Sequence, residues 1–171
     1  MNKPIKHSQL AEILLKVIAP FKKTEMVDTT PNEDFAQIAV KFPFRILVAE
    51  DNLINQKLIR NIFELLGYKI DIAANGIEVL EALKRKIYDV IFMDIQMPEM
   101  NGYETTRIII SHRNMTRPII IAMTANAMQG DREKCFEVGM DDYVTKPMRV
   151  DNLIKVLHNW GEKKFPNSLY I

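Results

Sequence analysis

Four apolar runs of this sequence each end on a residue that could take part in phosphoryl chemistry. The first run ends at Glu50 and Asp51, the second delivers Asp94, the third delivers Thr124 and the fourth delivers Lys146. In an open parallel α/β sheet the ligand crevice lies beyond the carboxyl ends of the strands, so residues that follow different strands converge there. The expected set is three carboxylates, one hydroxyl and one ammonium. These groups suit an aspartate that accepts a phosphoryl group with help from a divalent cation.

The adjacent carboxylates of Glu50 and Asp51 are the strongest single indication of a metal site. Two acids at one strand end repel each other, and Mg²⁺ relieves that repulsion because it favours one or two carboxylates together with water and phosphate oxygens. The structural alternative is a helix N-cap formed by Asp51 or Asn52, which explains one acid and not two. Taken alone, Asp94 would be a turn or cap residue. Beside these acids it is a candidate nucleophile that forms an acyl phosphate.

The remaining polar positions could bind the transferred group. Thr124 has few rotamers and can donate a hydrogen bond to a phosphate oxygen, although threonine at a strand end is common. Lys146 stands between a strand and Pro147, so it can project a positive charge towards a phosphate. Tyr143 could be a core residue or a movable aromatic, and the sequence leaves both open. The sequence contains no Gly-rich phosphate loop, which argues against nucleotide binding.

The composition bounds the class of protein. The chain has 171 residues, of which 47% are apolar, enough for one ordinary domain and an appendage. Lys and Arg number 23 against 22 Asp and Glu, and a net charge of +1 gives no electrostatic case for binding nucleic acid or a membrane. The single cysteine, Cys135, excludes an internal disulfide and favours a reducing, cytoplasmic location. No apolar run approaches the roughly 20 residues of a membrane span, although a parent protein could be membrane-anchored.

The elements that must position these residues alternate between strand and helix from residue 44 to about 160. Apolar runs predict buried strands, apolar residues at helical spacing predict the helices, and Gly67 and Gly139 are placed to end two of them. This alternation predicts a doubly wound α/β domain with a parallel sheet. Strands are expected at about 44–49, 69–73, 88–93, 119–123 and 141–145. Helices are expected at about 53–66, 102–112 and 130–138, and from about residues 77 and 150.

The chain before residue 44 differs in character. An amphipathic helix is predicted within 1–20, and 21–43 has the composition of a linker that could be a tether or could pack on the domain. Residues 3–14 align without gaps on 146–157. This echo suggests that the first helix is the last helix of a truncated preceding copy of the same domain.

Together, the blocks around the candidate residues resemble the receiver domain of two-component signalling. They read ILVAEDN at 46–52 with NQ at 55–56, MDIQMPEMNG at 93–102, AMTA at 122–125 and KP at 146–147. The resemblance covers residues 44–160, and the EDN form with NQ is most similar to receivers of hybrid sensor histidine kinases. It implies a flavodoxin-like sheet of five parallel strands in the order 2-1-3-4-5, flanked by five helices.

The resemblance also implies a role for each acid. Asp94 would be the phosphoacceptor. Glu50 and Asp51 would hold Mg²⁺ (or Mn²⁺) together with Asp94 and the backbone carbonyl of Gln96. Without a metal, three carboxylates and one lysine leave the crevice at about −2, which would repel a phosphoryl donor, and Mg²⁺ would cancel that charge.

The remaining roles concern the phosphoryl group and the response to it. By resemblance, Lys146 and Thr124 would bind the phosphoryl group, and Thr124 and Tyr143 would form the switch that follows it. Gln96 and Asn126 would tune how long the phosphoryl group survives.

The expected function is a phosphoacceptor module of a two-component phosphorelay. Its partner would be a histidine kinase or a histidine phosphotransfer protein, either of which can carry a phosphohistidine. A weak homodimer is compatible with the sequence. The module is not expected to be a stand-alone enzyme, and its parent could be a hybrid sensor histidine kinase. Residues 161–171 are expected to be a tail, too short for a DNA-binding output domain. The stimulus, the cognate kinase and the output are not encoded in any motif of the chain.

Two alternatives remain open at the level of sequence. An aspartate-nucleophile phosphatase would carry a second aspartate two residues after the nucleophile, where this chain has Gln96. A docking module that is never phosphorylated would bind its partner and would have no affinity for Mg²⁺.

Overall fold

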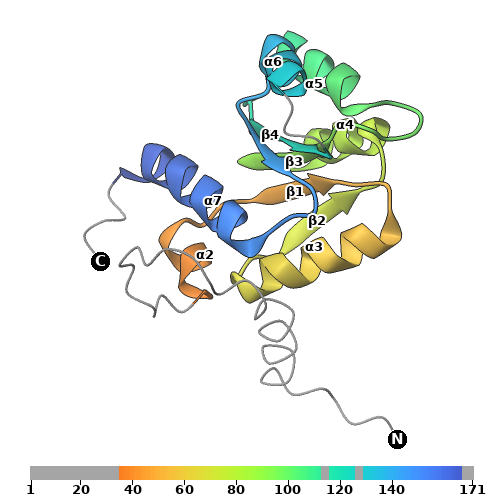
Figure 1. Cartoon of the computed structure of the whole chain (residues 1–171). Coiled ribbons are helices and arrows are strands. Elements are labelled where there is room, and N and C mark those ends of the chain that lie inside the picture. The colour runs from red at the N-terminus through yellow and green to blue at the C-terminus, as the bar shows by residue number, and fades with distance from the viewer. Residues whose placement is uncertain (1–34, 113–115, 126–128, 167–171) are drawn as a thin grey trace, which may run out of the picture. The chain divides into compact units, whose positions relative to one another are not determined.

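The described part of the chain is built on one parallel sheet of five strands (Figure 1). The computed structural model describes residues 35–112, 116–125 and 129–166. The strands are β1 (Ile46–Ala49), β2 (Ile70–Ala73), β3 (Val90–Asp94), β4 (Ile119–Thr124) and β5 (Asp142–Thr145). They follow the order β2-β1-β3-β4-β5, and every neighbouring pair is parallel. The predicted doubly wound, flavodoxin-like sheet is therefore confirmed.

The register of the sheet decides which residues meet at its carboxyl edge. Ala49 of β1 is level with Met93 of β3, so the next residues along the two strands, Glu50 and Asp94, lie side by side. Thr124 of β4 pairs with Thr145 of β5, which places Lys146 one step beyond that edge. The polar residues that follow the apolar runs are thus brought together by strand register alone.

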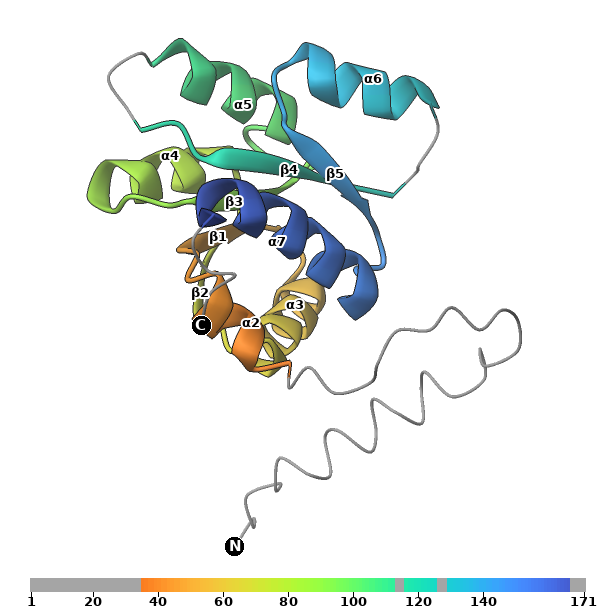
Figure 2. The same ribbon diagram turned by 90° about the vertical axis from the view of Figure 1, so that its left-hand side faces the viewer.

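Six helices accompany the sheet within the described residues, and they cover both of its faces (Figures 1 and 2). Their apolar residues fall into two buried clusters, one on each face. One cluster is formed with α2, α3 and α7, and the other with α4, α5 and α6. The helices are α2 (Gln37–Lys41), α3 (Leu53–Leu65), α4 (Gly76–Arg85), α5 (Gly102–Ser111), α6 (Gln129–Glu137) and α7 (Val150–Lys164).

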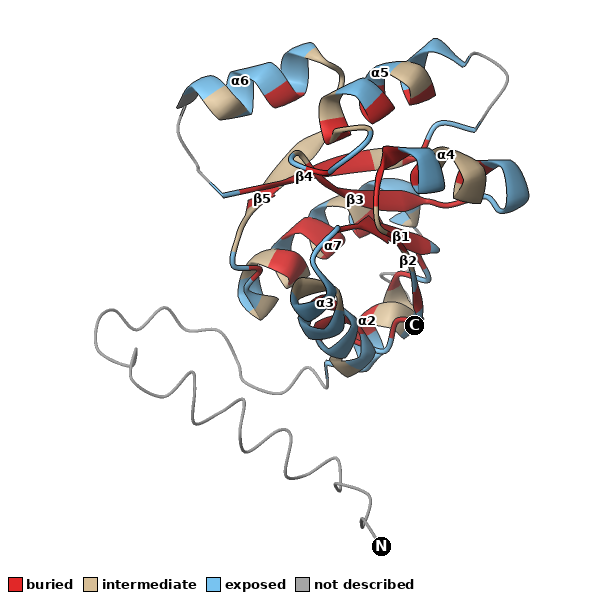
Figure 3. Ribbon diagram, turned by 90° about the vertical axis from the view of Figure 1, so that its right-hand side faces the viewer, coloured by how far each residue is buried: buried red, intermediate tan, exposed pale blue. Residues whose placement is uncertain are grey.

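The strands at the centre are buried on both faces, as their near-continuous apolar sequences predict (Figure 3). Successive residues of β1 point to opposite faces: Ile46 and Val48 join the cluster with α3 and α7, while Leu47 and Ala49 join the cluster with α4, α5 and α6. Because helices cover both faces of the sheet, a ligand can approach it only at the ends of the strands. No helix in the described ranges is long and apolar enough to cross a lipid bilayer.

Part of the segment expected to be a linker packs on the domain. α2 and the residue after it bury Ile38 and Phe42, whose exposed fractions are 3% and 0%. The ring of Phe42 lies edge-on to that of His158, and a Cβ added at Gly161 of α7 would overlap the Phe42 ring. The Tyr68 hydroxyl donates to the backbone carbonyl of Phe42 at 2.7 Å. The alternative in which this segment packs therefore holds for 35–43.

Two further predictions concern the start of the chain. The predicted helix within 1–20 and the echo of 146–157 at 3–14 lie outside the described residues.

At the other end of the domain, α7 continues to Lys164, beyond residue 160, where the domain was expected to end. Its last turns are held by the Gly161 contact with Phe42 and by an ion pair from Lys164 Nζ to Asp89 at 2.7 Å.

Asp89 forms a charged clip at the edge of the sheet opposite the carboxyl ends. The residue lies just before β3 and accepts hydrogen bonds from the backbone N–H of Arg45 at 2.8 Å and from its guanidinium at 2.9 Å. Lys164 adds the ion pair from α7. Burial alone would raise the pKa of Asp89, but the hydrogen bonds from Arg45 and Lys164 outweigh it and hold the pKa well below its ordinary value. The clip ties β1, β3 and α7 together.

Candidate functional site

Three carboxylates meet at the carboxyl edge of the sheet. Glu50 and Asp51 follow β1, and Asp94 is the last residue of β3. One carboxylate oxygen from each lies within 4.8 Å of the others. Glu50 and Asp94 are 1% and 5% exposed, whereas Asp51 is exposed to solvent. They line a cleft of about 800 Å³ that opens above the sheet. The predicted convergence of the three acids is found in the structure.

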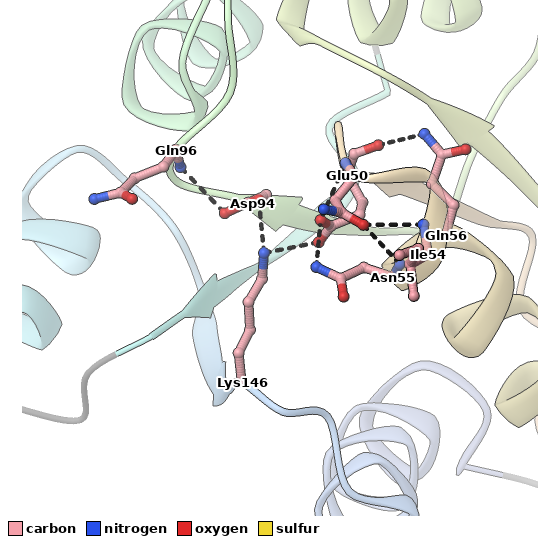
Figure 4. Close-up of polar contacts among 8 residues, drawn as sticks. Glu50, Ile54, Asn55, Gln56, Asp94, Gln96 and Lys146 are labelled. Carbon is pink, nitrogen blue, oxygen red and sulfur yellow. Dashed lines mark hydrogen bonds and ion pairs between the residues drawn. The ribbon is translucent and has the colours of Figure 1, made fainter.

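Lys146 bridges two of the three acids. Its Nζ donates to Glu50 Oε2 at 2.7 Å and to Asp94 Oδ2 at 2.6 Å (Figure 4). Its backbone N–H donates to the carbonyl of Thr124 at 2.7 Å, which fixes the start of the Lys146 side chain relative to β4. The Lys146 ammonium thus pairs with both Glu50 and Asp94. Within this cluster of four residues, no second cation balances the charge of Asp51.

Burial and charge act against each other at this cluster. Burial of Asp94 raises its pKa, and the contacts with Lys146 offset only part of that effect, so the pKa stays above the ordinary aspartate value. Burial of Lys146 lowers its pKa, but the hydrogen bonds to Asp94 and Glu50 outweigh burial, and the pKa of the ammonium is raised. Lys146 is therefore held in its charged form, and the cluster keeps an excess of negative charge.

The carboxylate of Glu50 is held from the first turn of α3 (Figure 4). Asn55 Nδ2 donates to Glu50 Oε1 at 2.8 Å, and Gln56 Nε2 donates to the backbone carbonyl of Glu50 at 2.6 Å. Asn52 is the N-cap of α3, since its side chain accepts from the N–H groups of Ile54 and Asn55. The cap that the sequence offered as an alternative use for Asp51 is thus made by Asn52, and Asp51 is left to face the cleft.

The donor set fits a hard divalent cation. Three carboxylates from two strand ends supply oxygen ligands within reach of one position, and Asp51 opens that position to the cleft. Mg²⁺ is bound in proteins by one or two carboxylates, with water and phosphate oxygens completing its shell. A single lysine leaves the cluster at about −2, which a doubly charged ion would neutralise.

Comparisons with known proteins identify the family of this chain. Residues 46–158 match the family described as the response regulator receiver domain. The chain belongs to that family.

Histidine kinases are among the proteins that this chain resembles. Histidine protein kinase 1 of Candida albicans is 36% identical over an alignment of 163 positions, which covers 84% of this chain and 7% of the kinase. The receiver domain of sensor histidine kinase PA1611 from Pseudomonas aeruginosa, solved with a magnesium ion in its active site cleft, is 43% identical. It covers 68% of this chain and 96% of its own, with a TM-score of 0.63. The chain therefore spans a small part of the length of its curated relatives.

A third relative was solved with a partner. The receiver domain of the yeast response regulator Ssk1, in complex with the histidine phosphotransfer protein Ypd1, is 30% identical. The match covers 70% of this chain and 90% of that one, with a TM-score of 0.64. Residues 46–158 of this chain are accordingly a receiver domain of two-component signalling.

Two other residues singled out from the sequence, Gln96 and Thr124, lie at the ends of the strands that form the site. The backbone N–H of Gln96 donates to Asp94 Oδ1 at 3.1 Å, which orients the carboxylate, while the Gln96 side chain is exposed. Thr124 ends β4 and is 7% exposed. Asn126 lies outside the described residues.

Tyr143 of β5 is half-buried and packs against α6. Its ring makes an edge-on contact with Phe136 at 6.5 Å between centroids, and the guanidinium of Arg132 lies 5.2 Å from its centroid. The sequence left open whether Tyr143 is a core residue or a movable aromatic. Its partial burial against the core cluster fits the first role, and its place at the edge of the domain is compatible with the second. Tyr143 belongs to the edge strand of the sheet, and its neighbours on α6 are largely exposed.

Sequence reasoning did not assign Asn55 and Gln56 to the site, although it noted them in a motif. The sequence did contain a signal. Asn55 and Gln56 lie in the first turn of the helix that follows Glu50 and Asp51, so their side chains are close enough to reach these acids. Sequence reasoning also gave no role to Tyr103 and Lys134, which line the cleft as well, with Lys134 Nζ 4.8 Å from the centroid of the Tyr103 ring. These residues come from α5 and α6, and only the packing of those helices brings them to the cleft.

Proposed function

We propose that Asp94 is the phosphoacceptor of this receiver domain. The observation that carries the proposal is the double contact of Lys146 with Glu50 and Asp94 inside a buried acidic cluster. An oxygen of the Asp94 carboxylate would attack the phosphorus of a phosphohistidine, forming an acyl phosphate while the phosphorus–nitrogen bond breaks. The bonding electrons leave with the imidazole, which takes up a proton. Phosphoryl transfer of this kind depends on positioning and charge more than on covalent help from the protein.

A divalent cation completes the proposed site. Glu50, Asp51 and Asp94 would hold Mg²⁺ with the backbone carbonyl of Gln96, and the ion would neutralise charge on both the acceptor and the transferred group. The magnesium-bound receiver of the Pseudomonas kinase supports this assignment. The backbone N–H of Gln96 already fixes one oxygen of Asp94, which leaves the other oxygen beside Lys146.

The response to phosphorylation would involve the neighbouring strand ends. Lys146 would move from the two carboxylates to the phosphoryl oxygens, and Thr124 would donate its hydroxyl to the same group. Tyr143 would then leave its contacts with Arg132 and Phe136 and follow Thr124. Gln96, whose side chain is exposed at the mouth of the cleft, and Asn126, which follows β4, would set the lifetime of the acyl phosphate.

The proposed donor is a histidine phosphotransfer protein or the phosphohistidine of a kinase. The complex of the Ssk1 receiver with Ypd1 supports a donor of this class. Three apolar side chains of α3 are exposed next to the cleft, with exposed fractions of 77% for Leu53, 79% for Ile54 and 45% for Leu58. An exposed apolar patch of this kind is typical of an interaction surface. We propose that the donor docks on this patch.

The parent protein proposed for this domain is a hybrid sensor histidine kinase. The similarity to histidine kinases that are much longer than this chain supports that origin. Within the chain, we propose that 44–160 is the receiver proper, that 35–43 is an N-terminal addition to it, and that 1–20 belongs to a preceding unit. The domain itself would be modified by its donor and would turn over no other substrate.

Labelling with acetyl phosphate tests the phosphoacceptor directly. The chain would be incubated with acetyl phosphate with and without Mg²⁺, and its intact mass measured. One Mg²⁺-dependent phosphoryl adduct is expected in the wild type and in Asp89→Asn, which alters an equally buried aspartate of the same strand region. No adduct is expected in Asp94→Asn. An adduct that persists in Asp94→Asn, or that forms equally without Mg²⁺, would refute the assignment.

Transfer from a protein donor tests the docking surface separately. Ile54→Glu should slow transfer from phosphorylated Ypd1 and leave labelling by acetyl phosphate unchanged. Ile87→Glu is the matched control, because Ile87 is a 53% exposed isoleucine that follows α4, near the start of β3 and away from the cleft. Equal transfer rates for the two variants would argue against docking on α3.

A further inference from the structure

The first turn of α3 carries two amide side chains that are directed at Glu50 rather than at solvent (Figure 4). Asn55 Nδ2 reaches Glu50 Oε1 at 2.8 Å, and Gln56 Nε2 reaches the Glu50 carbonyl at 2.6 Å. Both atoms of Glu50 are acceptors only, so the NH₂ end of each amide must face them. The proposed chemistry at Asp94 uses neither residue.

Glu50 needs these donors because of where it lies. Its side chain is 1% exposed, and two further carboxylates lie beside it. A buried carboxylate is tolerated only when its oxygens are hydrogen-bonded or paired. Oε1 accepts hydrogen bonds from Asn55 Nδ2 and from the backbone N–H of Asn52, the latter at 3.3 Å. Oε2 accepts one from Lys146 Nζ at 2.7 Å. The two oxygens thus have different partners, one set neutral and the other charged.

We propose that Asn55 and Gln56 are positioning residues that set the affinity of the acidic cluster for a divalent cation. The proposal rests on the metal site of the proposed function. With Oε1 held by a neutral donor, Oε2 is the oxygen turned towards Asp94 and Lys146, where a cation would bind. Gln56 holds the carbonyl of the peptide that joins Glu50 to Asp51, and so restrains the second acid as well.

The chemistry of the amides suits this task. An amide donates without adding charge, so the excess of negative charge that attracts a cation is preserved. A lysine or arginine at either position would satisfy Glu50 equally well and would compete with the ion. The amides also stand on a well-anchored element, since the Asn52 cap fixes the first turn of α3 through the N–H groups of Ile54 and Asn55. Groups that orient metal ligands from rigid elements contribute strongly to metal affinity.

Leucine substitutions test the proposal with little risk to the helix. Asn55→Leu and Gln56→Leu keep a side chain of similar size, remove the donor and do not lower helix propensity. Asn61→Leu is the control, because Asn61 is an exposed asparagine further along α3. Mg²⁺ affinity would be measured from backbone amide shifts in NMR titrations, after circular dichroism has shown that each variant is folded.

Asn55→Leu should weaken Mg²⁺ binding by about 10-fold, as loss of a group that orients a metal ligand typically does. Gln56→Leu should weaken it less, and Asn61→Leu not at all. The acetyl phosphate reaction gives a second readout. The Mg²⁺ concentration for half-maximal labelling should rise by the same factor in Asn55→Leu, while the rate at saturating Mg²⁺ changes little. A purely structural role would lower the melting temperature without moving this concentration.

The outcomes separate this inference from the proposed function. Wild-type Mg²⁺ affinity in both Asn55→Leu and Gln56→Leu would overturn the inference, even if labelling of Asp94 proceeds normally. If Asn55→Leu fails to fold, Gln56→Leu decides alone. A wild-type chain that binds Mg²⁺ but acquires no phosphoryl group would contradict the phosphoacceptor role, while the titrations would still support or overturn the positioning role. A wild-type chain without Mg²⁺ affinity would refute both.

Discussion

Two aspartates at the two ends of one strand have opposite electrostatic surroundings. Asp89 lies just before β3 and Asp94 ends it, and both are 5% exposed. Asp89 is in contact with the guanidinium of Arg45 and the ammonium of Lys164. Asp94 shares the single ammonium of Lys146 with Glu50. The pKa of Asp89 lies well below the ordinary value, whereas the pKa of Asp94 lies above it.

Equal burial therefore produces a structural clip at one end of β3 and a reactive cluster at the other. Burial raises the pKa at both positions, and the charge balance of the neighbours decides whether that effect survives. At Asp89 cations outnumber the carboxylate, and the site is complete within the protein. At Asp94 three carboxylates face the single ammonium of Lys146, and the negative charge that remains would attract a cation from solution.

The largest expected difference between the two ends is the response to Mg²⁺. A ligand present at 100 times its dissociation constant stabilises the folded state by about 2.7 kcal/mol. Wild type and Asp89→Asn should both gain this stability, whereas Asp94→Asn should lose most of the gain because one of the three carboxylates is gone. Urea unfolding with Mg²⁺ and with EDTA measures the difference. Equal gains in the two variants would show that the cation binds elsewhere.

The second difference should appear in the absence of any metal. Asp89→Asn should lower the free energy of unfolding by roughly 2 kcal/mol, since hydrogen bonds to a charged group are worth about 1.5–3 kcal/mol. Asp94→Asn should lower it by less, because the substitution also relieves repulsion from Glu50 and Asp51. Both variants would be unfolded in urea with EDTA. A larger loss in Asp94→Asn would reverse the assignment of clip and cluster.

The pH dependence of stability should carry the sign of the Asp89 shift. Its folded pKa is lowered, so the stabilisation is fully present above the ordinary aspartate value of about 3.9 and is lost as the pH falls below it. The stability difference between wild type and Asp89→Asn should therefore shrink by about 1 kcal/mol between pH 5 and pH 3. Urea unfolding at the two pH values gives the difference. A gap that widens on acidification would mean that the pKa is raised.

The smallest expected effect concerns the outer partner of the clip. Lys164 is 37% exposed, so its ion pair with Asp89 is screened by water. Lys164→Met should lower the free energy of unfolding by only about 0.5 kcal/mol, in the range of other exposed pairs. Thermal unfolding would be compared with that of Lys163→Met, which removes a neighbouring lysine of α7. A loss as large as that of Asp89→Asn would mean that Lys164, not Arg45, holds the aspartate.

The sequence predicts much of this architecture because the governing signals are local. Short runs rich in apolar and β-branched residues identify the five strands. The rule that ligands lie beyond strand ends is then enough to bring Glu50, Asp94 and Lys146 together. The Asp89 clip was not predicted, because it depends on an arginine 44 residues away and on the far end of α7. Nothing in the local sequence distinguishes Asp89 from a turn residue.

The parts that escaped prediction depend on tertiary packing. α2 has five residues, too few to be stable alone, so its existence depends on the burial of Ile38 and Phe42. The hydrogen bonds of Asn55 and Gln56 depend on the placement of α3 over β1. The roles assigned to Thr124 and Tyr143 remain predictions, since they concern a phosphorylated state.

The packing of α2 has a practical consequence for anyone who isolates this domain. The family match begins at residue 46, which invites a shortened chain that starts there. Such a chain would lose Phe42 and Phe44, uncover the apolar surface of α7, and remove the carbonyl groups that accept from Tyr68. Newly exposed apolar surface promotes aggregation. The shortest well-behaved fragment should therefore begin before α2, and poor solubility of a tighter fragment would reflect where it was cut.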